Sequence, residues 1–92
     1  MQAITPAEIA SHLAAVPAWQ VLDGQLVRTF TFQDFAGALR FVNRVADLAE
    51  AASHHPDIDI RYNRVRLALT THDAGGLTGK DFELAAAADQ AA

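Results

Sequence analysis

Hydrophobic and polar positions follow two different periods along the chain, and the changes of period divide it into seven predicted elements. Apolar residues recur at helical spacing over residues 6–16 and 34–52, and an Ala-rich segment with a helix-start sequence covers residues 78–90. Residues 19–22 and 26–32 are short strand candidates, residues 58–62 alternate between apolar and polar as in a half-buried strand, and residues 65–71 form a further predicted strand. The order is therefore helix, two strands, helix, two strands, helix.

Local signals at the ends of these segments support their boundaries. Thr5 and Glu8 have the spacing of a capping box at the start of the first helix. Asp23-Gly24 is a dipeptide that favours a type I′ turn between the first two strands. Pro56 disfavours helical geometry in the residue before it, so the long helix should end near residue 52.

The order of elements and the short connections between strands predict an α+β fold. We expect a four-stranded antiparallel sheet with three helices packed on one face, in a single domain that spans residues 1–92. A domain of this size buries only about 60–65% of the surface of its unfolded chain. A homodimer or homotetramer is therefore expected, and free strand edges would favour it.

The long helix carries a broad apolar face, which predicts that it lies flat on the sheet and offers a further surface to a partner. One stripe, widened by three further residues, makes up this face: Phe35, Leu39, Val42, Ala46 and Ala49, with Phe41, Val45 and Leu48.

Charge and composition exclude several classes of function. The net charge is −4 and the seven basic residues are scattered along the sequence, so no nucleic-acid partner is expected. No apolar run approaches the roughly 20 residues of a membrane helix, and the first ten residues lack the features of a signal peptide. The chain has no cysteine, which excludes disulfides and thiolate chemistry. A cytoplasmic protein without a membrane partner is therefore expected.

Three histidines fall at predicted element ends, where functional sites are often built. His54 and His55 end the long helix, and His72 ends the last strand. Imidazole can give or take a proton near neutral pH, although a histidine at a helix C-terminus is also favoured by the helix dipole alone. The spacing lacks the i, i+4 or His-x-His pairs of a metal site, so no metal is expected.

Two acidic residues admit both a structural and a functional interpretation. Asp81 is placed to cap the last helix three residues after Thr78. Glu50 lies late in the long helix, where the dipole disfavours a negative charge, and this hints at a local purpose.

The spacing of these residues from Glu50 to Asp81, taken together, indicates a family more specifically than any one of them does. Glu50-x3-His54-His55-Pro56-x5-Tyr62-x9-His72-x8-Asp81 resembles the pattern of the pterin-4a-carbinolamine dehydratase family. The resemblance implies a hydro-lyase that removes water from 4a-hydroxytetrahydropterin, giving quinonoid dihydropterin in pterin recycling. It also implies no metal and no bound cofactor, a pterin small-molecule substrate, and subunits that form dimers or tetramers.

The resemblance also implies roles for individual residues. His54, His55 and His72 would line the catalytic site, with His54 and His72 as the groups that transfer protons and His55 binding or orienting the pterin. Which histidine is the acid and which the base stays open. Four further residues would bind or orient the substrate or the histidines: Glu50, Ser53, Lys80 and Asp81.

Departures from the family pattern and alternative functions also belong to the prediction. The departures are Ser53, Ile58, Ile60 and Arg61, and they bear on pterin affinity and rate.

One alternative is a non-catalytic dimerisation or binding module that uses the apolar face of the long helix, including Phe41 or Leu48. Another is a metal-dependent activity, which full activity in EDTA would exclude. The sequence leaves the physiological pterin and the hydroxylase it serves open.

Overall fold

The computed structural model describes residues 2–92 and contains the seven predicted elements together with one short 3₁₀ helix. The elements in chain order are α1 (Pro6–Leu13), β1 (Gln20–Leu22), β2 (Gln25–Thr31), α2 (Phe35–Ala52), β3 (Asp57–Arg61), β4 (Arg64–Leu69), η1 (His72–Ala74) and α3 (Gly79–Ala91). The 3₁₀ helix η1 lies in the connection between β4 and α3.

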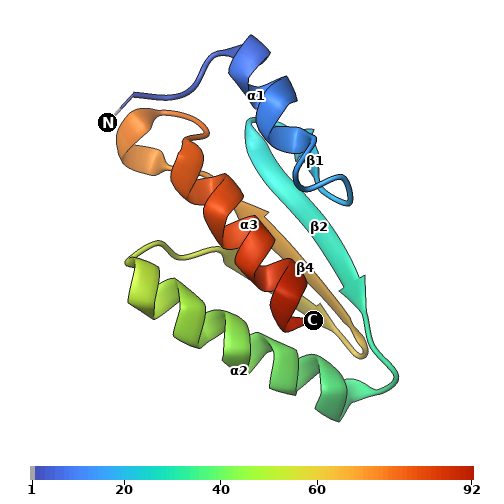
Figure 1. Ribbon diagram of the computed structural model, residues 1–92. Helices are drawn as coiled ribbons and strands as arrows, with labels where there is room; N and C mark the ends of the chain where they lie inside the picture. Colours follow the sequence, from blue (N-terminus) through green and yellow to red (C-terminus); the bar gives the residue numbers. More distant parts are fainter. Residues whose placement is uncertain (1) are drawn as a thin grey trace.

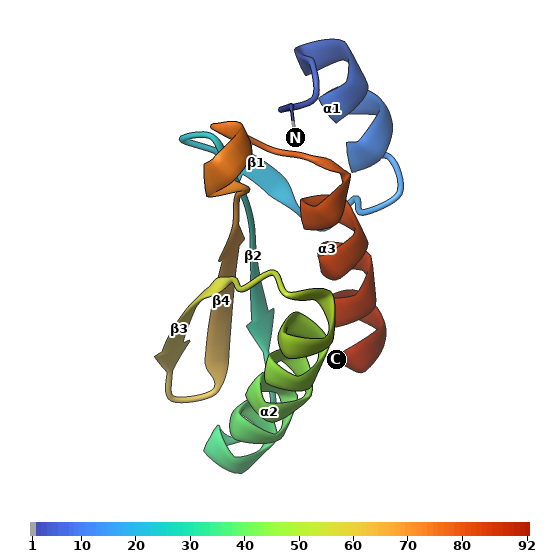
Figure 2. The same ribbon diagram turned by 90° about the vertical axis from the view of Figure 1, so that its left-hand side faces the viewer.

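The four strands form one antiparallel sheet in the order β1-β2-β4-β3. The three α-helices lie on one side of this sheet, and the other side is left open by residues 2–92 (Figures 1 and 2). The α+β fold predicted from the sequence is therefore confirmed, with β1 and β3 as the two edge strands.

Two tight turns connect the hairpins. Asp23 and Gly24 both have positive φ, 50° and 76°, as a type I′ turn requires, and this turn is confirmed. The turn between β3 and β4 consists of Tyr62 and Asn63. Tyr62 has a φ of 52° and is 67% exposed, so its side chain is not part of the buried face that strand alternation predicted.

The capping box at the start of α1 is present. The backbone N–H of Thr5 donates to Glu8 Oε1 over 3.0 Å, and the backbone N–H of Glu8 donates to the Thr5 hydroxyl oxygen over 3.3 Å. The hydrogen bonds from the backbone and then the side chain of Thr5 hold the pKa of Glu8 below its usual value. The helix ends at Leu13, before the predicted end at residue 16, and Val16 is buried in the core.

The core lies between the helices and the sheet, and it corrects the predicted face of α2. The buried residues of this helix are Ala38, Phe41, Val45 and Ala49. Phe41 packs at ring-centroid distances of 4.5 Å from Phe30 and 5.0 Å from Phe32. Phe35, which the sequence assigned to the apolar stripe, is 47% exposed because it begins the helix beyond the core. Phe41 is fully buried, so it is not available to a partner as the sequence suggested.

Edge strand β3 is only partly covered by the helices. Ile58 and Ile60 face the helical side, opposite Leu67 and Val65 of β4, yet they are 38% and 37% exposed. The face of β3 that was expected to be buried is therefore only partly buried. No helix within residues 2–92 is long and apolar enough to cross a membrane.

Candidate active site

The C-terminus of α2 directs the two adjacent histidines apart. Ser53 follows the helix in the left-handed conformation, with φ 51° and ψ 41°, a role more often filled by glycine. The backbone N–H of His54 then donates to the carbonyl of Ala49 over 3.1 Å, which closes the helix end. Pro56 leads the chain into β3. The two imidazoles belong to one segment but have different partners.

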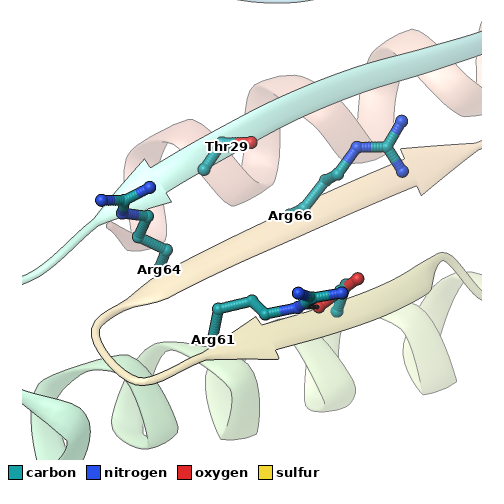
Figure 3. A pocket seen from close by; sticks show the side chains of 5 residues that line it. Thr29, Arg61, Arg64 and Arg66 are labelled. Carbon is teal, nitrogen blue, oxygen red and sulfur yellow. Dashed lines mark hydrogen bonds and ion pairs between the residues drawn. The ribbon is translucent and has the colours of Figure 1, made fainter.

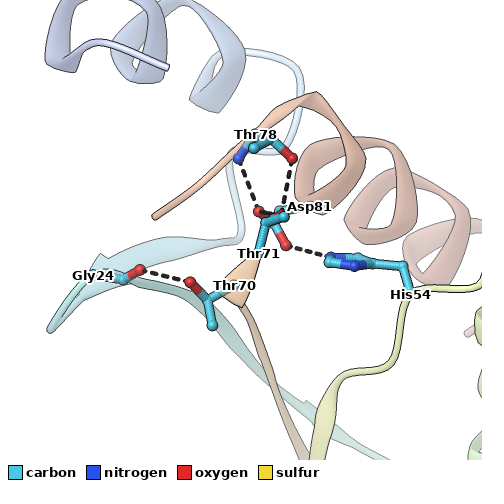
Figure 4. Close-up of polar contacts among 6 residues, drawn as sticks. All are labelled: Gly24, His54, Thr70, Thr71, Thr78 and Asp81. Carbon is cyan, nitrogen blue, oxygen red and sulfur yellow. Dashed lines mark hydrogen bonds and ion pairs between the residues drawn. The ribbon is translucent and has the colours of Figure 1, made fainter. Parts of the chain in front are cut away.

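His54 contacts a buried carboxylate. Its Nε2 lies 2.6 Å from Asp81 Oδ1, and the two side chains are 11% and 0% exposed (Figure 4). Since a carboxylate only accepts, Nε2 carries the proton and the neutral ring has Nδ1 as its acceptor. Nδ1 has no hydrogen bond within residues 2–92, and no buried side-chain nitrogen or oxygen of these residues lacks a partner. Nδ1 is therefore accessible to solvent.

Asp81 is held by a network from two elements. Its Oδ2 accepts from the Thr71 hydroxyl over 2.8 Å and from the backbone N–H of Thr78 over 2.9 Å. The hydroxyls of Thr71 and Thr78 lie 2.9 Å apart, so Thr78 donates to Thr71 while Thr71 donates to Asp81 (Figure 4). Asp81 thus caps α3 and orients His54 at the same time, and Thr71, Thr78 and Asp81 are all buried.

His55 contacts Glu50 instead, through a hydrogen bond between its Nε2 and Glu50 Oε2. The side chains are 63% and 76% exposed, so this pair contributes little to stability. The contact gives Glu50 a local partner at a helix end where the dipole disfavours its charge. It also holds the His55 ring near the end of α2.

One open depression of about 260 Å³ gathers most of the predicted site residues. Its lining comes from the end of α2, the end of β4, η1 and the start of α3: Ser53, His54, His55, Thr70, Thr71, His72, Asp73 and Lys80. All three predicted catalytic histidines are in this set. Glu50 and Asp81 are not in the lining, and they reach the depression through the histidines that they contact.

Sequence reasoning missed most of the polar residues that support this site, and it placed Thr78 only at the start of the last helix. Thr71 and Thr78 are buried beside Asp81, and Thr70 and Asp73 line the depression. Thr71 ends an otherwise apolar strand face, and a polar residue at such a position is the signal that could have revealed it. Within residues 2–92, no group of three or more His, Cys, Asp or Glu side chains is placed to hold a metal ion.

Comparison with known proteins adds independent information. The family model described as pterin 4 alpha carbinolamine dehydratase matches residues 2–91. A candidate pterin-4-alpha-carbinolamine dehydratase of Chloroflexus aurantiacus is 63% identical over 90 residues, which cover 98% of this chain and 97% of the relative. A similarly named protein of Thermomicrobium roseum is 56% identical over 85 residues, which cover 92% of this chain and 91% of the relative.

A solved structure resembles the whole chain. The crystal structure of a transcriptional coactivator/pterin dehydratase from Brucella melitensis superimposes with a TM-score of 0.95 at 34% sequence identity. The match covers 99% of both chains. Together with the family model and the relatives, this shows that the chain belongs to the pterin 4 alpha carbinolamine dehydratase family.

Proposed function

We propose that the protein is a cytoplasmic hydro-lyase that dehydrates 4a-hydroxytetrahydropterin to quinonoid dihydropterin in pterin recycling. The observation that carries the proposal is the grouping of His54, His55 and His72 around one depression, with His54 held by the buried Asp81. The names of the relatives, which cover nearly the whole chain, support the same substrate class.

The reaction needs two proton transfers. The C4a–O bond breaks and the hydroxyl leaves as water after it receives a proton, while N5 loses its proton and its electron pair forms the C4a–N5 double bond. His54 and His72 divide these two transfers, and the neutral Nδ1 of His54 can accept a proton because Nε2 is bound to Asp81. The negative charge of Asp81 stabilises the imidazolium that forms.

The remaining residues of the depression bind or orient the pterin. His55, fixed by Glu50, stands beside His54, and Ser53 and Lys80 complete the rim. These polar groups surround an open site of about 260 Å³, close to the lower limit of typical ligand pockets. The side chains named here supply the proton transfers without a bound cofactor.

A dehydration assay tests the proposal. With 4a-hydroxytetrahydropterin generated in the cuvette, wild type should exceed the rate in buffer, and His72→Ala should lose about 10²–10⁴-fold in kcat. His12→Ala is the matched control, since His12 stacks on Phe82 at 4.9 Å and does not line the depression. Equal rates for wild type, His72→Ala and buffer would refute the enzymatic function. Loss of activity in EDTA would indicate a metal-dependent reaction instead.

We further propose that the protein forms a homodimer or homotetramer. The outer edge of β3 has no strand beside it within residues 2–92, and Ile58 and Ile60 remain more than one-third exposed there. Pairing of two β3 edges would satisfy free backbone groups and cover these side chains.

A non-catalytic dimerisation module is the second candidate function. A groove of about 390 Å³ between α2 and α3 favours it, with an apolar lining that includes Leu48, Leu84 and Ala87. The coactivator part of the Brucella melitensis protein's name agrees with such a role. Self-association that Leu48→Glu abolishes and His54→Ala preserves, in a wild type without dehydratase activity, would favour this function.

A further inference from the structure

The open face of the sheet gathers three of the six arginines of the chain. Arg64 and Arg66 project from β4 and Arg61 from β3, all on the side away from the helices (Figure 3). The sequence suggested that the basic residues are scattered, but the strand register places Arg61 directly opposite Arg64. Thr29 of β2 lies opposite Arg66 on the same face. The three arginines lie within residues 61–66, and the antiparallel pairing of this hairpin brings them together on one face.

The charges in this cluster are not balanced within the chain. Asp59 is the direct cross-strand neighbour of Arg66, yet its carboxylate bonds Arg61 Nε at 3.1 Å. Arg64 and Arg66 form no ion pair with any residue from 2 to 92. Like charges opposite each other across two strands destabilise a sheet, as Arg61 and Arg64 do here. The chain has a net charge of −4, and the stability of the fold does not explain why three of its arginines are placed together.

The cluster surrounds a space that a small ligand can enter. A shallow depression of about 370 Å³ is lined by Thr29, Asp59, Arg61, Arg64 and Arg66. Its lining contains three guanidinium groups, one hydroxyl and one carboxylate, that of Asp59. This carboxylate forms an ion pair with Arg61. No aromatic or large aliphatic side chain lines it. No residue lines both this depression and the one that contains the histidines.

The chemistry of this lining selects its ligand. The planar fork of arginine matches the oxygen pairs of a phosphate group, and charge-assisted bonds of this type are among the strongest hydrogen bonds in proteins. We propose that the open face of the sheet binds a small phosphorylated molecule, held by Arg64 and Arg66 and supported by Arg61 and Thr29. The volume suits a compact ligand that carries one or two phosphate groups better than one that needs an apolar pocket for a ring.

Titration of the ¹⁵N-labelled full chain with inorganic pyrophosphate tests this site. Saturable shifts should concentrate on the five lining residues and weaken with added salt. Arg66→Gln and Arg64→Gln should each weaken binding at least about tenfold, a change of about 1.4 kcal/mol. Arg64→Lys, which keeps the charge but loses the fork, should lie between wild type and Arg64→Gln.

Matched controls make the outcome decisive. Arg40→Gln removes the same charge from the exposed surface of α2, and His54→Ala alters the other depression, so both should bind pyrophosphate as wild type does. Equal weakening in Arg40→Gln, shifts centred on the histidines, or no saturation at millimolar pyrophosphate would overturn the proposal. A single-stranded oligonucleotide that binds this face while pyrophosphate does not would overturn the assignment to a small molecule. Because the two depressions share no residue, the dehydration assay fails or succeeds independently of this result.

Discussion

The Asp81 carboxylate lies 2.6 Å from Nε2 of His54, although the two residues are 27 positions apart in the chain. Asp81 is fully buried in the first turn of α3, and His54 follows the end of α2. The contact joins the two helix termini at the base of the depression. It also leaves Nδ1 as the only nitrogen of His54 available to a substrate.

Replacing Asp81 by Asn should reduce both catalysis and stability. The amide nitrogen cannot accept, so one orientation of Asn loses the bonds from Thr71 and Thr78 and the other loses the bond to His54. The free energy of unfolding should fall by about 1–3 kcal/mol, as for other buried groups left unpaired. We expect kcat to fall at least about tenfold, because the imidazolium of His54 loses its counter-charge.

Asp73→Asn is the control for this change, since Asp73 lines the depression but is exposed. Rate measurements on folded protein and urea unfolding separate the two effects. A fully active Asp81→Asn protein would contradict the role assigned to the carboxylate.

Thr71→Val should destabilise the protein although it preserves the shape of the side chain. The hydroxyl of Thr71 donates to Asp81 and accepts from Thr78, and both partners are buried. We expect a loss of about 1–3 kcal/mol in the free energy of unfolding. Thr70→Val is the matched control, because the Thr70 hydroxyl has only a 3.5 Å contact with the Gly24 carbonyl and should change stability by less than about 0.5 kcal/mol. Equal effects of the two substitutions in urea unfolding would rule out the network as the cause.

Ile60→Lys should shift the protein toward a monomer. The substitution places a charge on the partly exposed face of edge strand β3, where a second copy would pair. Light scattering at micromolar concentration should give at least a dimer mass for wild type and a smaller mass for the variant. Leu22→Lys is the control on the opposite edge strand, where the side chain is 48% exposed. A wild-type monomer, or an equal shift in both variants, would contradict association through β3.

Glu8 should contribute to stability in a pH-dependent manner. Its hydrogen bonds with Thr5 lower its pKa in the folded state, so its contribution is present above the unfolded-state pKa. The contribution is lost as the pH falls through the lowered folded-state pKa. Thermal unfolding of wild type and Glu8→Gln should therefore differ at neutral pH and converge in acid. A difference in thermal stability between wild type and Glu8→Gln that grows toward low pH would contradict the predicted pH dependence.

Helix starts and tight turns could be predicted from the sequence because local interactions determine them, whereas α1 ends before the predicted residue 16. The capping box at Thr5 and the turn at Asp23-Gly24 involve neighbouring residues only, and both occur as predicted. Each of the four predicted strand segments overlaps a strand, and the order of elements led to the correct fold. The three histidines were found because they stand at element ends in a specific string, and the structure gathers them around one depression.

Tertiary structure alone decided which of these residues are partners. Thr71 reaches Asp81 only because the end of β4 and the start of α3 are packed together, and no periodicity encodes that contact. Burial of Phe41 and exposure of Phe35 depend on where α2 lies over the sheet. Arg61, Arg64 and Arg66 are close in the sequence, but strand register decides that they share one face of the sheet. Hydrogen bonding within a few residues determines the helices and tight turns, whereas the pairing of β2 with β4 and the contacts between elements arise from packing of the whole chain.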